Sequence, residues 1–499
     1  MNEISCVCMF TIMHDHAIWK DDVMTSMIIE TFQSEIHMFY YLIPSTQRIL
    51  YYSFYNCVLL VCNSNNRVTM SNNNNNNNDK QRKVALLTGV TGFIGASVLK
   101  GLLCDPAQWL VIVIIRPKVV TRTASGKKIR RKKNARPMSS DERMKNLIAR
   151  LGIPEEHGSR VHLVESHIDA TTDSETLYQV IVTEISRHMP GQPLRLDLVI
   201  HMAASLQQDC PGMPDEKAER IRQRNQDVNV TGCTSILDCI GRFGCPETVR
   251  VVRTSIVCGA DSSTGAMAFL NYFKSRWIRF MGRVLFYFQK SIPFFGCEDA
   301  ILDIIDIKDV VGAVMDLVHL DCDAPRETGL GAVYYMSTAY VHGKRKGLLK
   351  EEPVYMKPDQ EYHNSYEETK AHAEHVVHTW AARLSGEKDM CTYHNLTNEN
   401  SPTLKQVIVM MYEYYKGPLS YAEKFQFYDD VDAFHAALLE IRPRIAGRYL
   451  KKYYRYIHVL SAYLVRDPGT TFDSSLTTKI LGHPAAMTPI SAMTFSSRV

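Results

Sequence analysis

A tyrosine and a lysine stand four residues apart in the stretch HNSYEETKAHAEHVV, residues 363–377. Residues four apart share one face of a helix, so Tyr366 and Lys370 are expected one turn from each other. A tyrosine alone has a pKa of about 10 and is a poor acid at neutral pH. A neighbouring ammonium group stabilises the phenolate and lowers that pKa. The pair therefore predicts a general acid that protonates a carbonyl oxygen as hydride reaches its carbon.

A hydroxyl group on a neighbouring strand would hold the same oxygen. The segment YYMSTAYVHG places Ser337 and Thr338 at the end of a predicted strand, just before the tyrosine helix. The run VVRTSIV offers Thr254 or Ser255 as an alternative, but no tyrosine–lysine pair follows it. We therefore prefer Thr338 for this role.

A glycine-rich turn is predicted near the start of the ordered chain, in KVALLTGVTGFIGASVLKGLL, residues 83–103. The apolar run before the turn reads as a buried strand, and the residues after it have helical spacing. This order of strand, turn and helix is typical of sites where a diphosphate meets backbone N–H groups at a helix N-terminus. The candidate contacts are Thr88, Gly89, Thr91, Gly92, Phe93, Ile94 and Gly95.

Two further strands bear on the cofactor. WLVIVIIRP, residues 109–117, ends at Arg116, and a cation at that place favours the 2′-phosphate of NADPH, whereas an acid would favour NAD. An ordinary solvated arginine is the alternative. LDLVIHMAAS, residues 196–205, ends in small residues that let a cofactor lie against the sheet edge, and we interpret His201 as a packed histidine. The remaining candidate cofactor contacts are Asp169, Ala203, Ala204, Ser255, Tyr366, Lys370 and Asn229, the last near the start of a predicted helix.

The composition indicates a globular chain of two or three domains. It has 499 residues, of which 45% are hydrophobic and 22% charged, with a net charge of +4. The 13 cysteines are scattered, which suits a reducing compartment and argues against a structural zinc site. Residues 1–79 end in an asparagine tract and predict a disordered extension. Its apolar run at residues 48–62 is shorter than the roughly 20 residues of a membrane span, so an anchor is the less favoured alternative.

Two stretches combine basic residues with other features. Residues 116–136 carry ten Lys or Arg and no acid, which predicts a solvated loop or a surface for anionic lipid or the phosphates of coenzyme A. No nucleic-acid-binding motif accompanies them, so a nucleic-acid partner is not expected. Residues 266–296 mix aromatic and basic side chains, which fits a buried helix pair, an acyl-chain channel or a membrane-facing surface.

The motifs together carry a family resemblance over residues 83–485. LTGVTGFIG, VIHMAAS, NVTG, STAYV, SYEETK, SIVCGA and AILDIIDIKDVV resemble an extended short-chain dehydrogenase/reductase. STAYV and the late segment YLVRDPGTTFDSSLTTKIL resemble, more narrowly, a fatty acyl-CoA reductase. The resemblance implies NADPH, a long-chain acyl-CoA substrate, a fatty alcohol product, and residence at a peroxisomal or endoplasmic reticulum membrane. It also implies that Lys370 holds the nicotinamide ribose.

The expected fold is an α/β, doubly wound (Rossmann-like) parallel sheet over residues 80–386, with a smaller, mainly helical C-terminal domain over residues 387–499. The order of segments departs from the family, because VVRTSIV and ILDIIDIKDVV precede STAYV and SYEETK. We predict that the STAYV strand nevertheless fills the gap between the VIHMAAS and VVRTSIV strands, because a strand's place is set by its neighbours. The rival readings are a steroid or sugar-nucleotide dehydrogenase and a non-catalytic relative that binds dinucleotide.

Overall fold

The structure is a computed structural model, and it describes residues 82–117, 139–209, 213–259, 291–323, 328–357, 359–387, 390–414, 423–440, 463–464 and 469–488. The chain divides into the units Met1–Asp79 and Lys80–Val499, and all described residues belong to the second. The predictions made for residues 1–79, for the basic stretch beyond residue 117 and for the aromatic stretch up to residue 290 lie outside the described residues.

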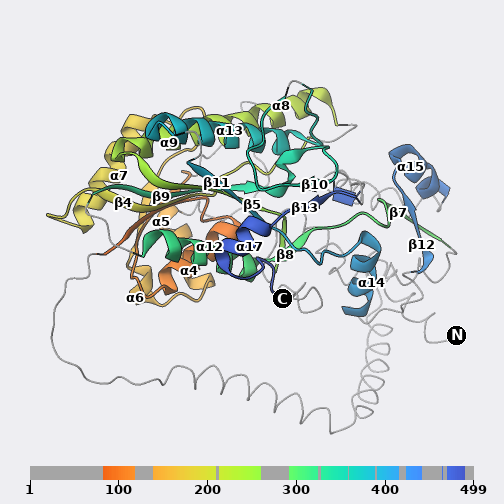
Figure 1. Cartoon of the computed structure of the whole chain (residues 1–499), viewed down its shortest axis with the longest axis horizontal. Helices are drawn as coiled ribbons and strands as arrows, with labels where there is room; N and C mark the ends of the chain where they lie inside the picture. Colours follow the sequence, from red (N-terminus) through yellow and green to blue (C-terminus); the bar gives the residue numbers. More distant parts are fainter. Residues whose placement is uncertain are drawn as a thin grey trace, which may run out of the picture. The chain divides into compact units, whose positions relative to one another are not determined.

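A parallel sheet of seven strands forms the centre of the second unit (Figure 1). The runs Val84–Leu87 and Leu110–Ile115 in this sheet are continuously apolar, as expected where helices cover both faces. In spatial order they are β11 (Cys391–Leu396), β5 (Pro246–Thr254), β9 (Gly329–Thr338), β4 (Arg195–His201), β1 (Val84–Thr88), β2 (Leu110–Ile115) and β3 (Val161–Glu165). The predicted Rossmann-like fold class is confirmed. The edge strand β11 comes after residue 387, so part of the C-terminal region belongs to this sheet.

The predicted insertion of the STAYV strand is also confirmed. β9 lies between β4 and β5, although β5 precedes it in the chain. The register pairs His201 with Tyr335 on one side and Thr254 with Thr338 on the other. The strand itself ends at Thr338, and the next residues, Ala339–His342, form the 3₁₀ turn η3 rather than more strand.

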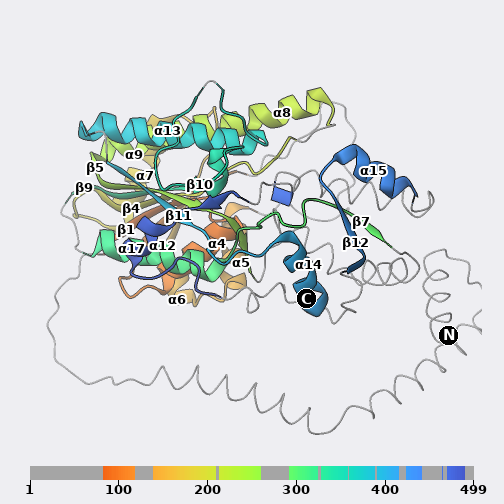
Figure 2. The same cartoon turned by 45° about the vertical axis from the view of Figure 1, so that its right-hand side comes forward.

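Helices cover both faces of the sheet (Figures 1 and 2). One face packs against α7 (Ser174–His188), α9 (Gly232–Ile240) and α13 (Ser365–Ser385). The other face packs against α4 (Phe93–Cys104) and α12 (Ile307–Cys322), with α5 (Ser140–Arg150), α6 (Glu155–Gly158) and α17 (Ser475–Leu481) on the same side of the sheet in the views shown.

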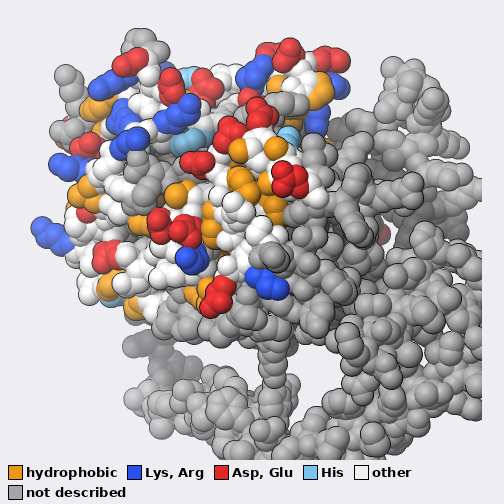
Figure 3. Space-filling view, turned by 90° about the vertical axis from the view of Figure 1, so that its right-hand side faces the viewer, with side chains coloured by type: hydrophobic (Ala, Val, Ile, Leu, Met, Phe, Trp, Pro, Cys, Tyr) orange, Lys and Arg blue, Asp and Glu red, His pale blue; other side chains and the backbone are white. Residues whose placement is uncertain are grey.

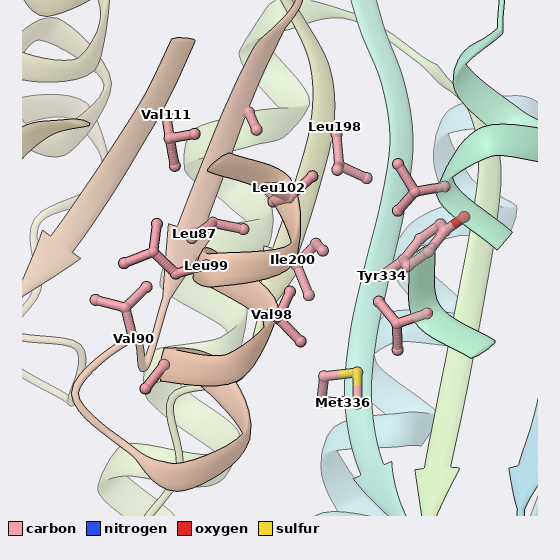
Figure 4. Packing of buried hydrophobic residues seen from close by; sticks show 14 of the residues in the cluster. Leu87, Val90, Val98, Leu99, Leu102, Val111, Leu198, Ile200, Tyr334 and Met336 are labelled. Atoms are coloured by element: carbon pink, nitrogen blue, oxygen red, sulfur yellow. The ribbon is translucent and has the colours of Figure 1, made fainter. Parts of the chain in front are cut away.

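Alternation along β9 decides which of its side chains face which helices. Tyr334 and Met336 belong to the core on the α4 side, and Figure 4 shows them in the same cluster as Ile200 of β4 and Val98 of α4. Tyr335 belongs to the opposite core, with Ala373 and Val377 of α13. Because successive strand residues point to opposite faces, Ser337 falls on the α13 face, with Tyr335.

A long helical segment crosses the α13 face and changes its winding on the way. It begins as α8 (Asp215–Asn225), passes through the π-helical stretch η1 (Gln226–Thr231), continues as α9 and closes with the 3₁₀ turn η2 (Gly241–Phe243). Asn229 lies inside the π-helical stretch, so its predicted position near a helix start is wrong. A π-helical insertion was not visible in the periodicity of the sequence.

A smaller lobe carries its own aromatic core. The strand β7 (Ile292–Phe295) pairs with β12 (Phe425–Tyr428), and α14 (Leu404–Tyr414) and α15 (Val431–Glu440) contribute to the same cluster of buried residues. Two short parallel pairs complete the unit: β6 (Ile256–Cys258) with β8 (Ile304–Asp306), and β10 (Leu348–Leu349) with β13 (Thr471–Phe472).

The visible surface is of mixed character. Where side chains are coloured in Figure 3, acidic, basic and hydrophobic groups lie interspersed, as is usual for a solvated face. Within the part of the chain that the structure describes, no helix is both long enough and apolar enough to cross a membrane.

Candidate active site

The glycine turn after β1 is built by close backbone approaches. Gly89 has a φ of +73°, and a Cβ added there would lie 2.6 Å from the backbone nitrogen of Ala203. A Cβ on Gly95 would overlap the carbonyl group of Gly89. Both positions therefore need glycine because backbone meets backbone, whatever ligand binds.

The N-terminus of α4 opens from this turn. Its N-cap is Gly92, which offers no capping side chain, and the first turn contains no acidic residue. Thr91, Phe93 and Ile94 complete the turn, with Thr91 exposed. Free N–H groups and the positive end of the helix dipole are thus left for an anion, so the turn fits the diphosphate of a dinucleotide.

Thr88, at the end of β1, ties the turn to the end of β4. Its Oγ1 accepts hydrogen bonds from the backbone nitrogens of Met202 and Ala203, at 3.0 and 3.1 Å, and lies 2.8 Å from Nδ1 of His201. Burial, with the charge of Lys370 second, lowers the pKa of His201 to about 3, so the ring is neutral. His201 is the packed histidine that the sequence predicted. Ala203 and Ala204 follow it beside the turn and are partly exposed.

The two hydroxyl groups at the end of β9 have different environments. Thr338 Oγ1 donates to the carbonyl oxygen of Thr254, at 3.3 Å, and accepts from the backbone nitrogen of Tyr340, at 3.4 Å. Ser337 is equally buried, yet its Oγ has no hydrogen-bond partner among the described residues. Because Ser337 also faces α13, the structure favours Ser337 over the predicted Thr338 as the hydroxyl that would hold a substrate oxygen.

Thr254 and Ser255 lie one strand further from the glycine turn. Thr254 ends β5, which is separated from β4 by β9, and Ser255 follows directly after it. Ser255 is buried, its backbone nitrogen donates to Leu396 at 3.2 Å, and its hydroxyl has no partner within the described segments. Its predicted cofactor contact is therefore less favoured than one from the end of β9.

The helix α13 begins at a well-formed cap. The side chain of Asn364 accepts from the backbone nitrogen of Glu367, and the helix ends at Gly386 with a φ of +74°. Tyr366 lies in the first turn and is partly exposed, and its hydroxyl makes no hydrogen bond to any described residue. The predicted helix and the shared face of Tyr366 and Lys370 are present.

Lys370 is not among the groups that shift the pKa of Tyr366. Burial, with the nearby carboxylate of Glu367 second, raises the pKa of Tyr366 above its usual value. Lys370 is buried, and its Nζ donates to the hydroxyl of Tyr335 at 3.1 Å and to the carbonyl oxygen of Met336 at 2.7 Å. The ammonium group is thus held by the end of β9 and not by the tyrosine one turn away.

Two asparagines that sequence reasoning did not combine join α13 to the loop after β4. Nδ2 of Asn225 donates to Ser365 Oγ, at 2.9 Å, and to the carbonyl oxygen of Gln207, at 2.8 Å. Nδ2 of Asn229 donates to Thr369 Oγ1, at 3.0 Å, and its Oδ1 accepts from the backbone nitrogen of Ser205, at 2.7 Å. The spacing of four in both helices was the available signal, and it was visible only once the two helices were known to be neighbours.

Arg116 follows β2 and lies near two other arginines. Nη1 of Arg143 donates to its carbonyl oxygen at 2.9 Å. Burial, and then the charge of Arg224, lower the pKa of Arg116, while Asp169 acts in the opposite direction. Asp169 itself is turned toward Thr171, which donates from its backbone nitrogen and its hydroxyl. An anionic group beside Arg116 would relieve the repulsion between the three guanidinium groups.

The residues present fit a dinucleotide. The turn cradles a diphosphate, the arginine group suits a phosphate, and Lys370 and Ser337 retain unused polar groups at the carboxyl ends of β4 and β9. In an open parallel sheet this edge is where ligands bind. Among the described residues no group of three or more His, Cys, Asp or Glu side chains could hold a metal ion.

Comparison with known proteins gives one family match. Residues 309–386 match the model of an NAD-binding family described as male sterility protein, and this segment contains most of α12 and all of β9 and α13. No match was found among curated proteins.

Among solved structures, the chain is similar in fold to UDP-glucuronic acid 4-epimerase from Bacillus cereus in complex with NAD, with 11% identity, 83% of this chain and 97% of that chain covered, and a TM-score of 0.39. It is similar to the terminal R domain of the myxalamid PKS-NRPS pathway, with 14% identity, coverage of 82% and 88%, and a TM-score of 0.40. It is also similar to the Bordetella bronchiseptica enzyme WbmG in complex with NAD, with 13% identity, coverage of 83% and 92%, and a TM-score of 0.38.

Proposed function

We propose that this protein is an NADPH-dependent reductase of the extended short-chain dehydrogenase/reductase type that converts a long-chain fatty acyl-CoA to a fatty alcohol. One observation carries the proposal. The strand with the unpartnered Ser337 hydroxyl lies next to β4, one strand away from the strand of the glycine turn, and the helix with Tyr366 and Lys370 packs against it, despite the altered segment order. The match of residues 309–386 to an NAD-binding family covers this same strand and helix.

The chemistry follows from the groups at the end of β9. NADPH, when held by the glycine turn and the arginine group, would supply hydride for the carbonyl carbon. Ser337 and Tyr366 hydrogen-bond the carbonyl oxygen, and Tyr366 gives it a proton as hydride arrives. Burial keeps Tyr366 protonated beforehand, so it enters the reaction as an acid. The C–S bond then breaks, the thiol of coenzyme A leaves with a proton, and an aldehyde remains. A second hydride and a second proton give the alcohol.

The specificity for NADPH is supported by the arginine group. Arg116 and Arg143 share a hydrogen bond at the end of β2, and Arg224 adds a third cation nearby. A 2′-phosphate carries the charge that this arrangement lacks, and phosphate–guanidinium contacts are among the stronger hydrogen bonds.

An apolar substrate is supported by the aromatic side chains that connect the end of β9 to the smaller lobe. Tyr340 comes two residues after Thr338, and its ring centroid lies 4.6 Å from that of Tyr463 and 5.5 Å from that of Phe472. These rings connect the end of β9 to the aromatic core of the smaller lobe. Peripheral contact with a peroxisomal or endoplasmic reticulum membrane belongs to the same proposal, because a long acyl chain partitions into lipid.

Purified protein with palmitoyl-CoA tests the proposal. We expect NADPH absorbance to fall only when both reactants are present, with hexadecanol as the product and NADH a much poorer donor. UDP-glucuronic acid and a 3-hydroxysteroid, each offered with NAD, serve as controls for the rival dehydrogenase readings. Turnover of either control without turnover of palmitoyl-CoA would overturn the acyl-CoA assignment. Nucleotide binding without any turnover would favour a non-catalytic relative.

A further inference from the structure

Lys370 is a buried cation that donates its hydrogen bonds to two residues of one strand, β9. It is 3% exposed, and no carboxylate lies within ion-pair distance of it among the described residues. An ammonium group has three N–H donors. Two are used by the Tyr335 hydroxyl and the Met336 carbonyl oxygen, which leaves one for a ligand.

The Lys370 ammonium contacts both the ring and the hydroxyl group of Tyr335. Nζ of Lys370 lies 4.5 Å from the ring centroid, within the range of a cation–π interaction, as well as 3.1 Å from the hydroxyl oxygen. The ring is fixed on its other side by His201, whose centroid lies 5.8 Å away with the two planes 23° apart. The register of the inserted strand, which sets Tyr335 opposite His201, creates this stack.

The orientation of His201 is fixed in turn by the glycine turn. The Thr88 hydroxyl accepts from two backbone nitrogens, so its single proton is free to be donated to Nδ1 of His201. The neutral ring then carries its proton on Nε2, which has no partner within the described residues. A continuous series of contacts therefore runs from Thr88, beside Gly89, through His201 and Tyr335 to Lys370.

We propose that Tyr335 is a positioning residue that holds the Lys370 ammonium at the end of β9. The remaining N–H of this ammonium is then directed to a hydroxyl group of the nicotinamide ribose or of the substrate. The inference rests on the proposed function for what the free N–H binds, but the placement of Lys370 is independent of it. It gives a role to a buried phenol that neither donates a proton to the substrate nor contacts the arginine group.

The hydroxyl of Tyr335 also affects the charge state of Lys370. Burial lowers the pKa of Lys370 to about 8, and the groups that face it raise that value: Cys233 from α9 and Glu374 from the next turn of α13. The neutral His201 faces it from β4. An acceptor for the ammonium favours the charged form, so removing the Tyr335 hydroxyl lowers the pKa of Lys370 further. Lys370 then loses its charge at a lower pH.

The test uses the ligand-free, full-length protein with ¹³C-labelled lysine. The ε-methylene signal of Lys370 is identified by its loss in Lys370→Met and followed by NMR as pH rises. We expect a midpoint near pH 8 in the unchanged protein and a fall of about one unit in Tyr335→Phe, the size of one hydrogen bond to a charged group. Tyr335→His keeps a ring and an acceptor and should stay within about half a unit of the unchanged midpoint.

Tyr334→Phe is the matched control. Tyr334 is the next residue of β9, is equally buried, and donates its hydroxyl to Asp321 at 2.6 Å on the other side of the sheet. It should lose stability like Tyr335→Phe and leave the Lys370 midpoint unchanged. NADPH affinity, followed by fluorescence, should fall with rising pH at the same midpoint in each variant.

The outcomes separate this inference from the proposed function. An unchanged Lys370 midpoint in Tyr335→Phe, or an equal fall in Tyr334→Phe, would overturn the role of Tyr335. If the midpoint falls as expected but no variant binds NADPH, the positioning role stands and the proposed function fails.

Discussion

The two consecutive hydroxyl residues at the end of β9, Ser337 and Thr338, have different environments. Thr338 uses its hydroxyl within the protein, whereas Ser337 faces α13 and has no partner among the described residues. The sequence showed both hydroxyls at a strand end. It could not show which of them faced the tyrosine helix, because that depends on where the strand lies in the sheet and where it ends.

Ser337→Ala should therefore affect mainly kcat, whereas Thr338→Val should affect mainly the stability of the fold. Removing the unpartnered Ser337 hydroxyl should lower kcat by roughly 10²-fold while changing stability little, since no protein hydrogen bond is lost. Thr338→Val should lower the free energy of unfolding by about 1 kcal/mol through two lost hydrogen bonds and keep most of kcat. Steady-state kinetics and urea unfolding measure both. A larger loss of kcat in Thr338→Val than in Ser337→Ala would show that Thr338, and not Ser337, holds the substrate oxygen.

Tyr366→Phe should abolish turnover and keep nucleotide binding. Only the proton donor is removed, and general acid catalysis contributes typically 10²–10⁴-fold. The hydroxyl makes no hydrogen bond to a described residue, so the fold should be unaffected. Single-turnover kinetics with NADPH, alongside its dissociation constant, is the measurement. Near-normal kcat in this variant would show that another group supplies the proton.

Arg116→Asp should shift the preference from NADPH toward NADH, because a 2′-phosphate would meet a like charge. A charge-assisted hydrogen bond is worth roughly 1.5–3 kcal/mol, or about tenfold or more in affinity. Arg143→Ala should weaken NADPH binding less and leave NADH binding unchanged, since the Arg143 guanidinium donates to the backbone carbonyl oxygen of Arg116. KM values for the two nucleotides check both variants, and an unchanged KM for NADPH in Arg116→Asp would remove this residue from the site.

At the scale of elements, two helices that lie apart in the chain are joined side by side. Asn225 and Asn229 each donate to a hydroxyl of α13, and the two acceptors are again four residues apart. A buried ion pair, Arg253 with Glu374 at 2.7 Å, fixes the next part of α13 to β5. Tyr366 and Lys370 lie between these attachments. The sequence predicted a helix that carries Tyr366 and Lys370 one turn apart, but the bonds that orient this helix come from segments 140 and 121 residues away.

A double-mutant cycle tests this attachment. Asn225→Ala and Ser365→Ala should each lower the free energy of unfolding by about 1 kcal/mol, and the double variant should lose less than the sum because the two share one hydrogen bond. Gln179→Ala, on the exposed surface of α7, is the control and should behave additively with Ser365→Ala. Strict additivity between Asn225→Ala and Ser365→Ala would contradict a bond between these helices.

At the scale of the whole molecule, the sheet accepts a strand out of chain order. The fold class and the insertion of β9 could be predicted from the buried runs, because the neighbours of a strand decide its place. Three features could not be predicted, because each depends on tertiary contacts. They are the π-helical stretch, the 3₁₀ turn that follows β9 and the hydrogen bond from Lys370 to Tyr335. The smaller lobe was predicted only as mainly helical, and it also contains paired strands.

Restoring the family order should speed folding. Phe243, the last residue of η2, lies beside the start of β9, because a Cβ on Gly329 would be 3.7 Å from the Phe243 carbonyl oxygen. A rearranged chain with residues 328–387 placed directly after residue 245 should therefore reach the same sheet. It should refold faster after dilution from urea and aggregate less, because β9 no longer enters between two formed strands. Equal refolding rates would indicate that insertion is not the slow step, and loss of the fold would contradict the strand order.

The most direct test of the account is the fate of labelled hydride. NADPH deuterated at C4 is incubated with palmitoyl-CoA and the purified protein, and the alcohol is examined by mass spectrometry. The account predicts hexadecanol with two deuterium atoms on C1, one from each reduction, and none when Tyr366→Phe replaces the unchanged protein. Hexadecanol without deuterium, or no product from a protein that binds NADPH, would contradict hydride transfer to the thioester carbon.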